Sequence, residues 1–262
     1  MDVIRRLGFF TSLRYLSCRF LQLPLMSLLR RPQRILSLRF RGIQSPVKFR
    51  SSGSDLQVIG QIFVHREYQL LDGIKPDEVD TVIDCGANAG YSAVWFLNRF
   101  PQCRVIAVEP DPDNFRMLQE NLMEYGDRAV TIQAGIWSHD TQLAIESEPY
   151  RDGKEWSRQV RELRDGEDGG INAVAIETLA QTHGLEAISV LKVDIEGAEC
   201  VILREGAENW LPLVDHLVME LHDDTDFGNA TPLFAGLFPA DRFQITHHDE
   251  LTYCRPNRPK AM

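Results

Sequence analysis

The stretch V-I-D-C-G-A-N-A-G-Y-S-A, which runs from Val82 to Ala93, indicates the fold of this chain. Its apolar start, together with the preceding Thr81, predicts a short buried strand from Thr81 to Ile83, and the glycines that follow predict a tight turn. Tyr91 to Arg99 then has the apolar spacing of a helix. A strand that passes through a glycine turn into a helix is the opening unit of a nucleotide-binding fold. We therefore expect an α/β, Rossmann-like domain.

The rest of the chain repeats this alternation of strands and helices. Four further strands are predicted at Arg104 to Val108, Val130 to Gln133, Ile188 to Val193 and His216 to Leu221. Helices are predicted at Leu56 to Leu71 with Asp55 as N-cap, at Asp111 to Tyr125, around Leu179 and within Val201 to Trp210. Alternating strands and helices favour a doubly wound, mostly parallel sheet with helices on both faces.

The 262 residues, 44% of them hydrophobic, favour one domain with appendages. We expect a basic N-terminal leader at 1–50 and the Rossmann-like domain at 51–262, with a cofactor-binding core at about 76–222. The segment 146–170 is dense in charge and glycine, which predicts an exposed insertion.

The leader is basic, since only Asp2 opposes its lysines and arginines, and its apolar residues recur every three positions from Ile4 to Leu16. This pattern predicts an amphipathic helix that packs on the domain or on a second subunit, or that contacts an anionic membrane surface. The longest uncharged run, Phe20 to Leu29, is too short to span a bilayer, and no signal-peptide pattern follows it. We expect a cytoplasmic protein, with peripheral membrane contact as the alternative.

The composition excludes several classes of partner and site. The net charge is -10, and the acidity lies almost wholly beyond residue 50, which disfavours a nucleic acid as the main partner. The five cysteines are widely separated and contain no C-x-x-C pair, so neither a disulfide framework nor a zinc site is predicted. A small molecule is the expected substrate.

Three acids lie at or just beyond the predicted strand ends, namely Asp84, Glu109 and Asp194, where a doubly wound sheet binds its ligands. Gly86 and Gly90 would let the turn approach a ligand, although a turn used only for packing is the alternative. The spacing D-x-G-x-x-x-G lacks the second glycine of a dinucleotide motif. An acid before the turn suits a ligand with ammonium and sulfonium charges, which S-adenosylmethionine carries.

Three ordered blocks of this sequence resemble the FkbM-type methyltransferases: V-I-D-C-G-A-N-A-G-Y-S-A at 82–93, V-I-A-V-E-P-D-P-D-N-F-R-M-L-Q-E-N-L at 105–122 and L-K-V-D-I-E-G-A-E at 191–199. The resemblance implies a Rossmann-like, S-adenosylmethionine-dependent O-methyltransferase that acts on a hydroxyl of a small molecule, a sugar or another secondary metabolite.

The resemblance also implies roles for individual residues. The expected cofactor-binding residues are Asp84, Gly86, Ala87, Asn88, Gly90, Glu109, Pro110, Asn114, Ala134 and Gly135. On the acceptor side we expect Asp194 and Glu196, with His222 as a base because of its position after a strand and its ordinary pKa range. A divalent metal on Asp194 with Asp223 or Asp224 is an alternative, but no spacing is diagnostic, so no metal ligand is assigned.

Two rival functions stay open on the sequence alone. One is a nicotinamide-dependent oxidoreductase on the same type of sheet, and the other is a cofactor-binding scaffold without turnover. A thermal shift with NADH and none with S-adenosylhomocysteine would favour the oxidoreductase, whereas cofactor binding without turnover on any acceptor would favour the scaffold.

Overall fold

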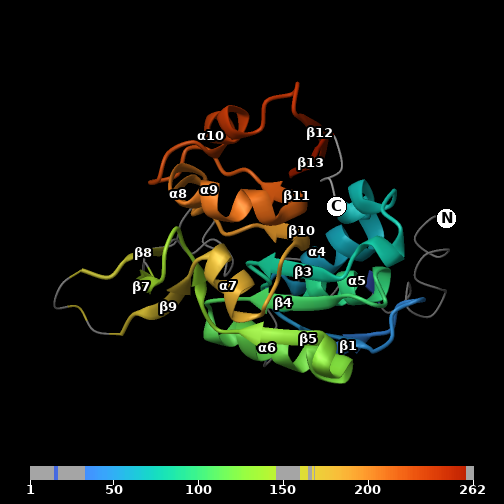
Figure 1. Ribbon diagram of the computed structural model, residues 1–262. Coiled ribbons are helices and arrows are strands. Elements are labelled where there is room, and N and C mark those ends of the chain that lie inside the picture. The colour runs from blue at the N-terminus through green and yellow to red at the C-terminus, as the bar shows by residue number, and fades with distance from the viewer. Residues whose placement is uncertain (1–14, 17–32, 146–159, 165–166, 168, 258–262) are drawn as a thin grey trace.

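The computed structural model describes residues 15–16, 33–145, 160–164, 167 and 169–257. Its centre is a seven-stranded sheet (Figure 1). The strands across the sheet are β12 (Phe243–His248), β13 (Leu251–Pro256), β11 (Val214–Glu220), β10 (Ile188–Val193), β3 (Thr81–Cys85), β4 (Arg104–Val108) and β5 (Ala129–Ile132). The five from β11 to β5 are parallel, while β13 runs antiparallel to both of its neighbours. The predicted mostly parallel sheet is therefore confirmed.

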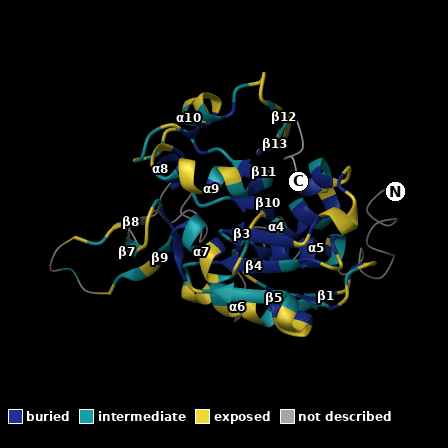
Figure 2. Cartoon of the chain, viewed as in Figure 1, coloured by how far each residue is buried: buried dark blue, intermediate teal, exposed yellow. Residues whose placement is uncertain are grey.

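Consecutive residues of the central strands bury their side chains on opposite faces of the sheet. Val82, Val105 and Val190 belong to one core cluster, whereas Ile83 and Ile106 belong to the other. The first face is covered by α4 (Asp55–Ile59), α5 (Tyr91–Arg99) and α6 (Pro112–Leu122), and the second by α7 (Ile176–Thr182), α8 (Glu199–Arg204), α9 (Ala207–Trp210) and α10 (Ala230–Leu237). The central strands β3, β4 and β10 lie almost wholly dark blue between these layers in Figure 2 because both of their faces are buried.

Several predicted elements have the bounds that the structure shows, namely α5, β4 and β10. The single helix expected at 56–71 is instead α4, a π-helical turn at Gly60–His65 and a 3₁₀ helix at Glu67–Leu71. Its N-cap is Ser54, because Asp55 is buried in an ion pair with Arg50. Further 3₁₀ helices lie at Pro76–Glu78, Met123–Arg128 and Leu211–Leu213.

A β-hairpin precedes the predicted domain boundary. Strands β1 (Ile35–Leu38) and β2 (Val47–Arg50) pair antiparallel, and Leu38 and Phe49 lie in the same core cluster as α5. The packed domain therefore begins before residue 51, within the range expected as leader. The amphipathic helix predicted for the leader falls almost wholly on residues 1–14 and 17–32, which lie outside the described residues.

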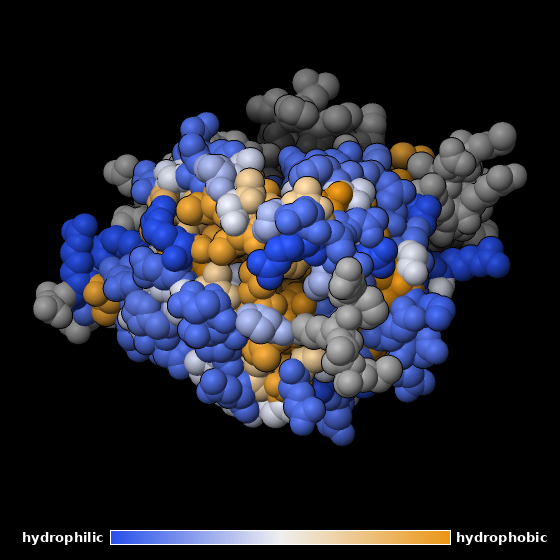
Figure 3. All heavy atoms as spheres, turned by 45° about the horizontal axis from the view of Figure 1, so that its top comes forward, coloured by the Kyte–Doolittle hydropathy of each residue, from blue (hydrophilic) through white to orange (hydrophobic). Residues whose placement is uncertain are grey.

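A small second sheet lies beside the main one and projects from the body of the molecule (Figure 1). Its strands are β6 (Gly135–Ile136), β9 (Ile171–Val174), β7 (Thr141–Ile145) and β8 (Val160–Glu162). Most of the predicted charged insertion, residues 146–159, lies outside the described part of the chain. Figure 3 shows hydrophilic side chains over most of one face of the molecule, with an apolar band through its middle. Among the described helices, none has the length and apolarity needed to cross a bilayer.

Candidate active site

The predicted acids come together because three neighbouring strands end at one level. Cys85, the last residue of β3, is in register with Val108 of β4 and Val193 of β10. The residues that follow these strands therefore share the carboxyl edge of the sheet, as the sequence predicts. The turn after β3 lies between the other two strand ends, since Asp194 donates its N–H to the Cys85 carbonyl at 3.2 Å.

Every backbone amide of the turn from Gly86 to Gly90 donates within the protein. The amides of Gly86 and Ala87 both donate to the Val108 carbonyl, and the amide of Asn88 donates to Glu109 Oε2 at 2.8 Å. The next two donate to the Asn88 side chain and to the Ala87 carbonyl. A pyrophosphate needs free amides from such a turn, so this geometry weighs against a dinucleotide cofactor.

Gly86 and Gly90 have the positive φ angles, 74° and 86°, that glycine adopts most readily. A Cβ on Gly86 would lie 1.8 Å from the Asp194 carbonyl oxygen, and a Cβ on Gly90 would lie 2.8 Å from Leu118 Cδ1. Protein atoms therefore fill the space that a Cβ would need, and the approach of a ligand to this turn stays a prediction. The absent side chains of these glycines let the turn pack against β10 and α6.

Asp84 is fully buried and faces a buried cation that the sequence analysis missed. Its Oδ2 accepts from the Ser92 hydroxyl at 2.6 Å, and its Oδ1 lies 3.3 Å from Lys192 Nζ. Although burial alone lowers the pKa of Lys192, the Asp84 and Asp194 carboxylates raise it overall. Lys192 also donates to the Gly86 carbonyl at 2.7 Å. Asp84 therefore fixes the turn through Lys192, and its contact with the methionine part of a cofactor stays a prediction.

Glu109 is held by hydrogen bonds that leave acceptor capacity. Its carboxylate accepts from the amides of Asn88 and Asp111, at 2.8 and 3.0 Å, and from Asn114 Nδ2 at 3.5 Å. Burial raises the pKa of Glu109 to about 7, and the two backbone hydrogen bonds oppose that rise. A carboxylate has about four lone-pair sites, so Glu109 can still accept from a ligand hydroxyl.

A buried chain of polar contacts supports Glu109 from the N-terminal hairpin. Asn114 Oδ1 accepts from the Arg50 guanidinium at 2.9 Å, and Arg50 contacts the Asp55 carboxylate through two nitrogens at 2.6 and 3.0 Å. All three side chains are buried. The orientation of Asn114 against Glu109 therefore depends on β2, which the sequence analysis placed in the leader.

The other residues predicted to bind the cofactor lie along the same edge. Ala87 and Ala134 are buried, and Pro110 is half-buried directly after Glu109. Gly135 opens β6, where a Cβ would lie 2.9 Å from Leu143 Cδ1.

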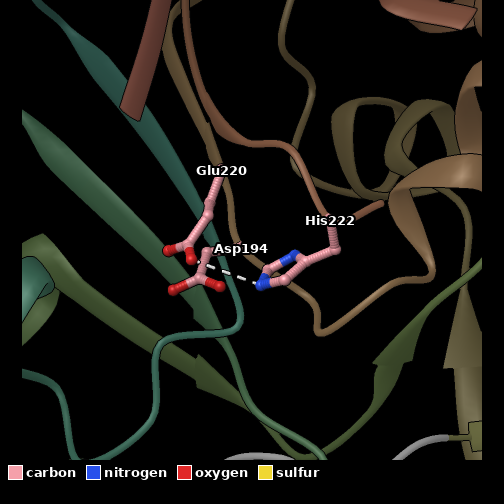
Figure 4. Close-up of side chains that lie close together, drawn as sticks. All are labelled: Asp194, Glu220 and His222. Carbon is pink, nitrogen blue, oxygen red and sulfur yellow. Dashed lines mark ion pairs between the residues drawn. The ribbon is translucent and has the colours of Figure 1, made fainter. Parts of the chain in front are cut away.

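The acceptor-side residues also converge, on the ends of β10 and β11 (Figure 4). One donor atom from each of Asp194, Glu220 and His222 lies within 4.8 Å of the others. His222 Nε2 lies 3.3 Å from Glu220 Oε1 and 3.8 Å from Glu196 Oε2. The structure therefore joins the predicted Asp194, Glu196 and His222 and adds Glu220.

Asp223 and Asp224, considered above as partners of Asp194 for a metal, serve the following loop. Asp223 Oδ1 accepts from the Thr231 amide at the start of α10, and Asp224 donates its amide to Asn229. Neither belongs to the cluster of Asp194, Glu220 and His222 that could hold an ion. Among the described residues, Asp194 thus groups with Glu220 and His222 and not with Asp223 or Asp224.

His222 does not titrate in the range expected of a base at neutral pH. Burial lowers its pKa, but the Glu199 and Glu220 carboxylates outweigh burial and raise it to about 11. Glu199 is itself fully buried, and its oxygens accept from the amides of Ile195 and Gly197 at 2.6 and 2.7 Å. His222 is thus an imidazolium cation at neutral pH when only protein surrounds it.

Two glutamates beside His222 also have shifted pKa values. Burial, with a contribution from Asp194, raises the pKa of Glu196 to about 9 and that of Glu220 to about 7. Glu67 is the first residue of the 3₁₀ helix Glu67–Leu71. Burial, with a contribution from Asp194, raises its pKa to about 8. Asp194 is more exposed than Glu196 and Glu220, with 33% of its side-chain surface accessible.

Four residues of the site were not predicted from the sequence, namely Arg50, Glu67, Lys192 and Glu199. Lys192 alone had a local signal, because it interrupts the apolar run of a predicted buried strand. A buried lysine needs a paired charge, which pointed to the acids at the same edge.

The family model described as "Methyltransferase FkbM domain" matches residues 84–252. This range contains the carboxyl ends of β3, β4, β10 and β11, where the site lies. The chain belongs to this family. It is a methyltransferase with the fold described above.

Three curated relatives are similar to this chain over about two thirds of its length. "Methyltransferase 1" of Beauveria bassiana is 26% identical over 66% of this chain and 76% of its own length. "Hexuronic acid methyltransferase AglP" of Haloferax volcanii is 25% identical over 62% of this chain and 64% of its own length. "2-O-methyltransferase NoeI" of Sinorhizobium fredii is 28% identical over 70% of this chain and 78% of its own length.

Proposed function

We propose that this methyltransferase uses S-adenosylmethionine and transfers its methyl group to a hydroxyl of a small molecule, a sugar, a glycan or another secondary metabolite. The observation that carries the proposal is the Glu109 carboxylate at the end of β4, buried, fixed by two backbone amides and still able to accept from a ligand. Two ribose hydroxyls are donors that such a carboxylate holds in nucleotide folds.

The residues at the edge fit this cofactor better than a dinucleotide. The turn amides are all engaged within the protein, which suits a ligand without phosphates. The acids at the Asp194 end of the edge suit a ligand that carries positive charge. Two relatives, one named a 2-O-methyltransferase and the other a hexuronic acid methyltransferase, support oxygen as the acceptor and a sugar as the substrate class.

Methyl transfer needs an acceptor oxygen held in line with the donor and a destination for its proton. S-adenosylmethionine supplies an activated methyl group on a sulfonium. The carbon–sulfur bond breaks as the carbon–oxygen bond forms, and the hydroxyl proton passes to a carboxylate of the edge. Asp194 is the best placed to orient the hydroxyl or to accept that proton, with Glu196 beside it. Positioning supplies most of the rate enhancement for such a displacement.

Labelled methyl transfer tests the proposal. The protein is incubated with S-adenosylmethionine that carries a labelled methyl group and with fractionated pools of sugars, glycans and small metabolites, and the products are identified by mass spectrometry. We expect label in an O-methyl ether. Label on nitrogen or carbon, or a protein that binds NADH and not S-adenosylhomocysteine, would overturn the proposal.

A further inference from the structure

We propose that Asp194, Glu220 and His222 form a site for a divalent cation of the Mn²⁺ or Zn²⁺ type, which holds the acceptor hydroxyl for methyl transfer. The role in transfer rests on the proposed function, whereas the binding of the ion does not. The three side chains come from the ends of two adjacent parallel strands, so the sheet itself holds them together (Figure 4).

The spacing of the donor atoms suits an ion of this size. One atom from each residue lies within 4.8 Å of the others, and His222 Nε2 lies 3.3 Å from Glu220 Oε1. Donors about 2.0 to 2.2 Å from one ion are at most about 4.4 Å apart. The His222–Glu220 pair at 3.3 Å already has the spacing of adjacent ligands, and the Asp194 oxygen, within 4.8 Å of both, completes the set by moving closer by about an ångström.

The orientation of His222 is a second observation that points to an ion. Its side chain is more than nine-tenths buried, and its Nδ1 lies 3.2 Å from Glu199, which turns Nε2 toward Glu220 and the strand end. Glu199 is fixed by two backbone amides and is fully buried. A carboxylate behind one ring nitrogen, with the other nitrogen facing two carboxylates, is the arrangement that orients metal-binding histidines.

The formal charges at this end of the edge also favour a cation. Lys192 donates to the Gly86 carbonyl and faces buried Asp84, so its charge is already balanced. Glu199 faces the His222 imidazolium in the same way, so Asp194 and Glu220 remain, and an ion with two positive charges that replaces the imidazolium proton would neutralise this pair. The side chains of Asp194 and Glu220 are 33% and 22% exposed, which leaves room for an acceptor on the solvent side.

The donor set selects the class of ion. Two carboxylate oxygens with one imidazole nitrogen suit Mn²⁺ or Zn²⁺ better than Mg²⁺ or Ca²⁺, which prefer oxygen ligands throughout. The ion would act as a template and a Lewis acid, because it would hold the hydroxyl oxygen and favour loss of its proton to solvent at the exposed side of Asp194.

Metal titration tests the site independently of activity. The full-length protein, stripped with a chelator, is titrated with Mn²⁺ and followed by electron paramagnetic resonance, and with Zn²⁺ by calorimetry. We expect one site per chain, with affinity at least tenfold weaker in Asp194→Asn and in Glu220→Gln. Glu199→Gln should weaken binding by about 10-fold to 100-fold, because it removes the group that orients His222. Glu208→Gln, at an exposed acid of α9, is the matched control and should bind as the parent does.

Two outcomes would overturn the metal site. One is the absence of saturable binding of either ion, and the other is equal binding by the parent and all variants, which would indicate attraction to the acidic surface. Circular dichroism on the same samples shows that each variant is folded, and S-adenosylhomocysteine binding is measured separately. Cofactor binding without metal binding would refute the ion alone, whereas metal binding without cofactor binding would refute the proposed function alone.

Discussion

The two ends of the carboxyl edge differ in how their carboxylates are satisfied. At the β4 end, Glu109 is 6% exposed and accepts hydrogen bonds from two backbone amides and Asn114. At the β10 and β11 ends, Asp194, Glu196 and Glu220 are 22 to 33% exposed and face few donors besides Lys192 and His222. The first end is therefore preorganised for neutral hydroxyls, and the second is an acidic surface suited to a cation and a reacting hydroxyl.

The largest expected effect separates the two ends by kinetics. Asp194→Asn keeps the size of the side chain and removes its charge, so turnover with the acceptor identified by labelling should fall by about 10²-fold to 10⁴-fold. Affinity for S-adenosylhomocysteine should stay nearly unchanged, because the lost interaction acts chiefly in the transition state. The exposed acid Asp226 supplies the control Asp226→Asn, which should keep full turnover. Full turnover in Asp194→Asn would move the acceptor side elsewhere.

The second effect concerns stability behind the Glu109 end. Arg50→Met leaves the Asp55 carboxylate buried without its ion pair, and breaking a buried pair in this way typically costs about 3 to 5 kcal/mol. Urea unfolding should therefore show a large loss of stability. Lys75→Met, in the exposed pair with Glu78, should leave the unfolding midpoint unchanged. Equal midpoints for Arg50→Met and the parent would show that the hairpin does not stabilise this end.

Glu109→Ala should weaken binding of S-adenosylhomocysteine by roughly tenfold or more, since a lost charge-assisted hydrogen bond costs about 1.5 to 3 kcal/mol. Calorimetry on the folded variant measures this change. Glu124→Ala, in the exposed 3₁₀ segment after α6, is the control and should bind normally. Unchanged affinity in Glu109→Ala would place the ribose outside the β4 end.

The smallest effect is a pH dependence at the same residue. Because burial raises the pKa of Glu109 to about 7, protonation below that pH removes an acceptor for the ribose. Affinity for S-adenosylhomocysteine should fall by up to about tenfold per pH unit below 7, and the fall should be absent in Glu109→Gln. The stability of the free protein changes with pH in the opposite direction to the affinity. Because the pKa of Glu109 is higher in the folded state than its ordinary 4.5, its contribution to stability is lost as pH rises from 4.5 to about 7. A pH-independent affinity in the parent would show that Glu109 does not titrate there.

Much of the central sheet was predictable because its strands are buried on both faces and read as short apolar runs. The same pattern placed Asp84, Glu109 and Asp194 at one edge, since position after a parallel strand fixes their level. Other features depend on contacts between distant segments, such as Arg50 with Asn114, and no local pattern reports these. The surroundings of Asp84 and His222 could not be predicted for the same reason: they include Lys192 and Glu199, whose side chains reach them only in the folded chain.

A crystal structure of the protein with S-adenosylhomocysteine tests the central claim most directly. We predict that both ribose hydroxyls lie within hydrogen-bonding distance of the Glu109 carboxylate and that the sulfur points toward the end of the edge that holds Asp194. Adenosine bound away from β4, or a sulfur directed away from Asp194, would contradict the assignment of the two ends.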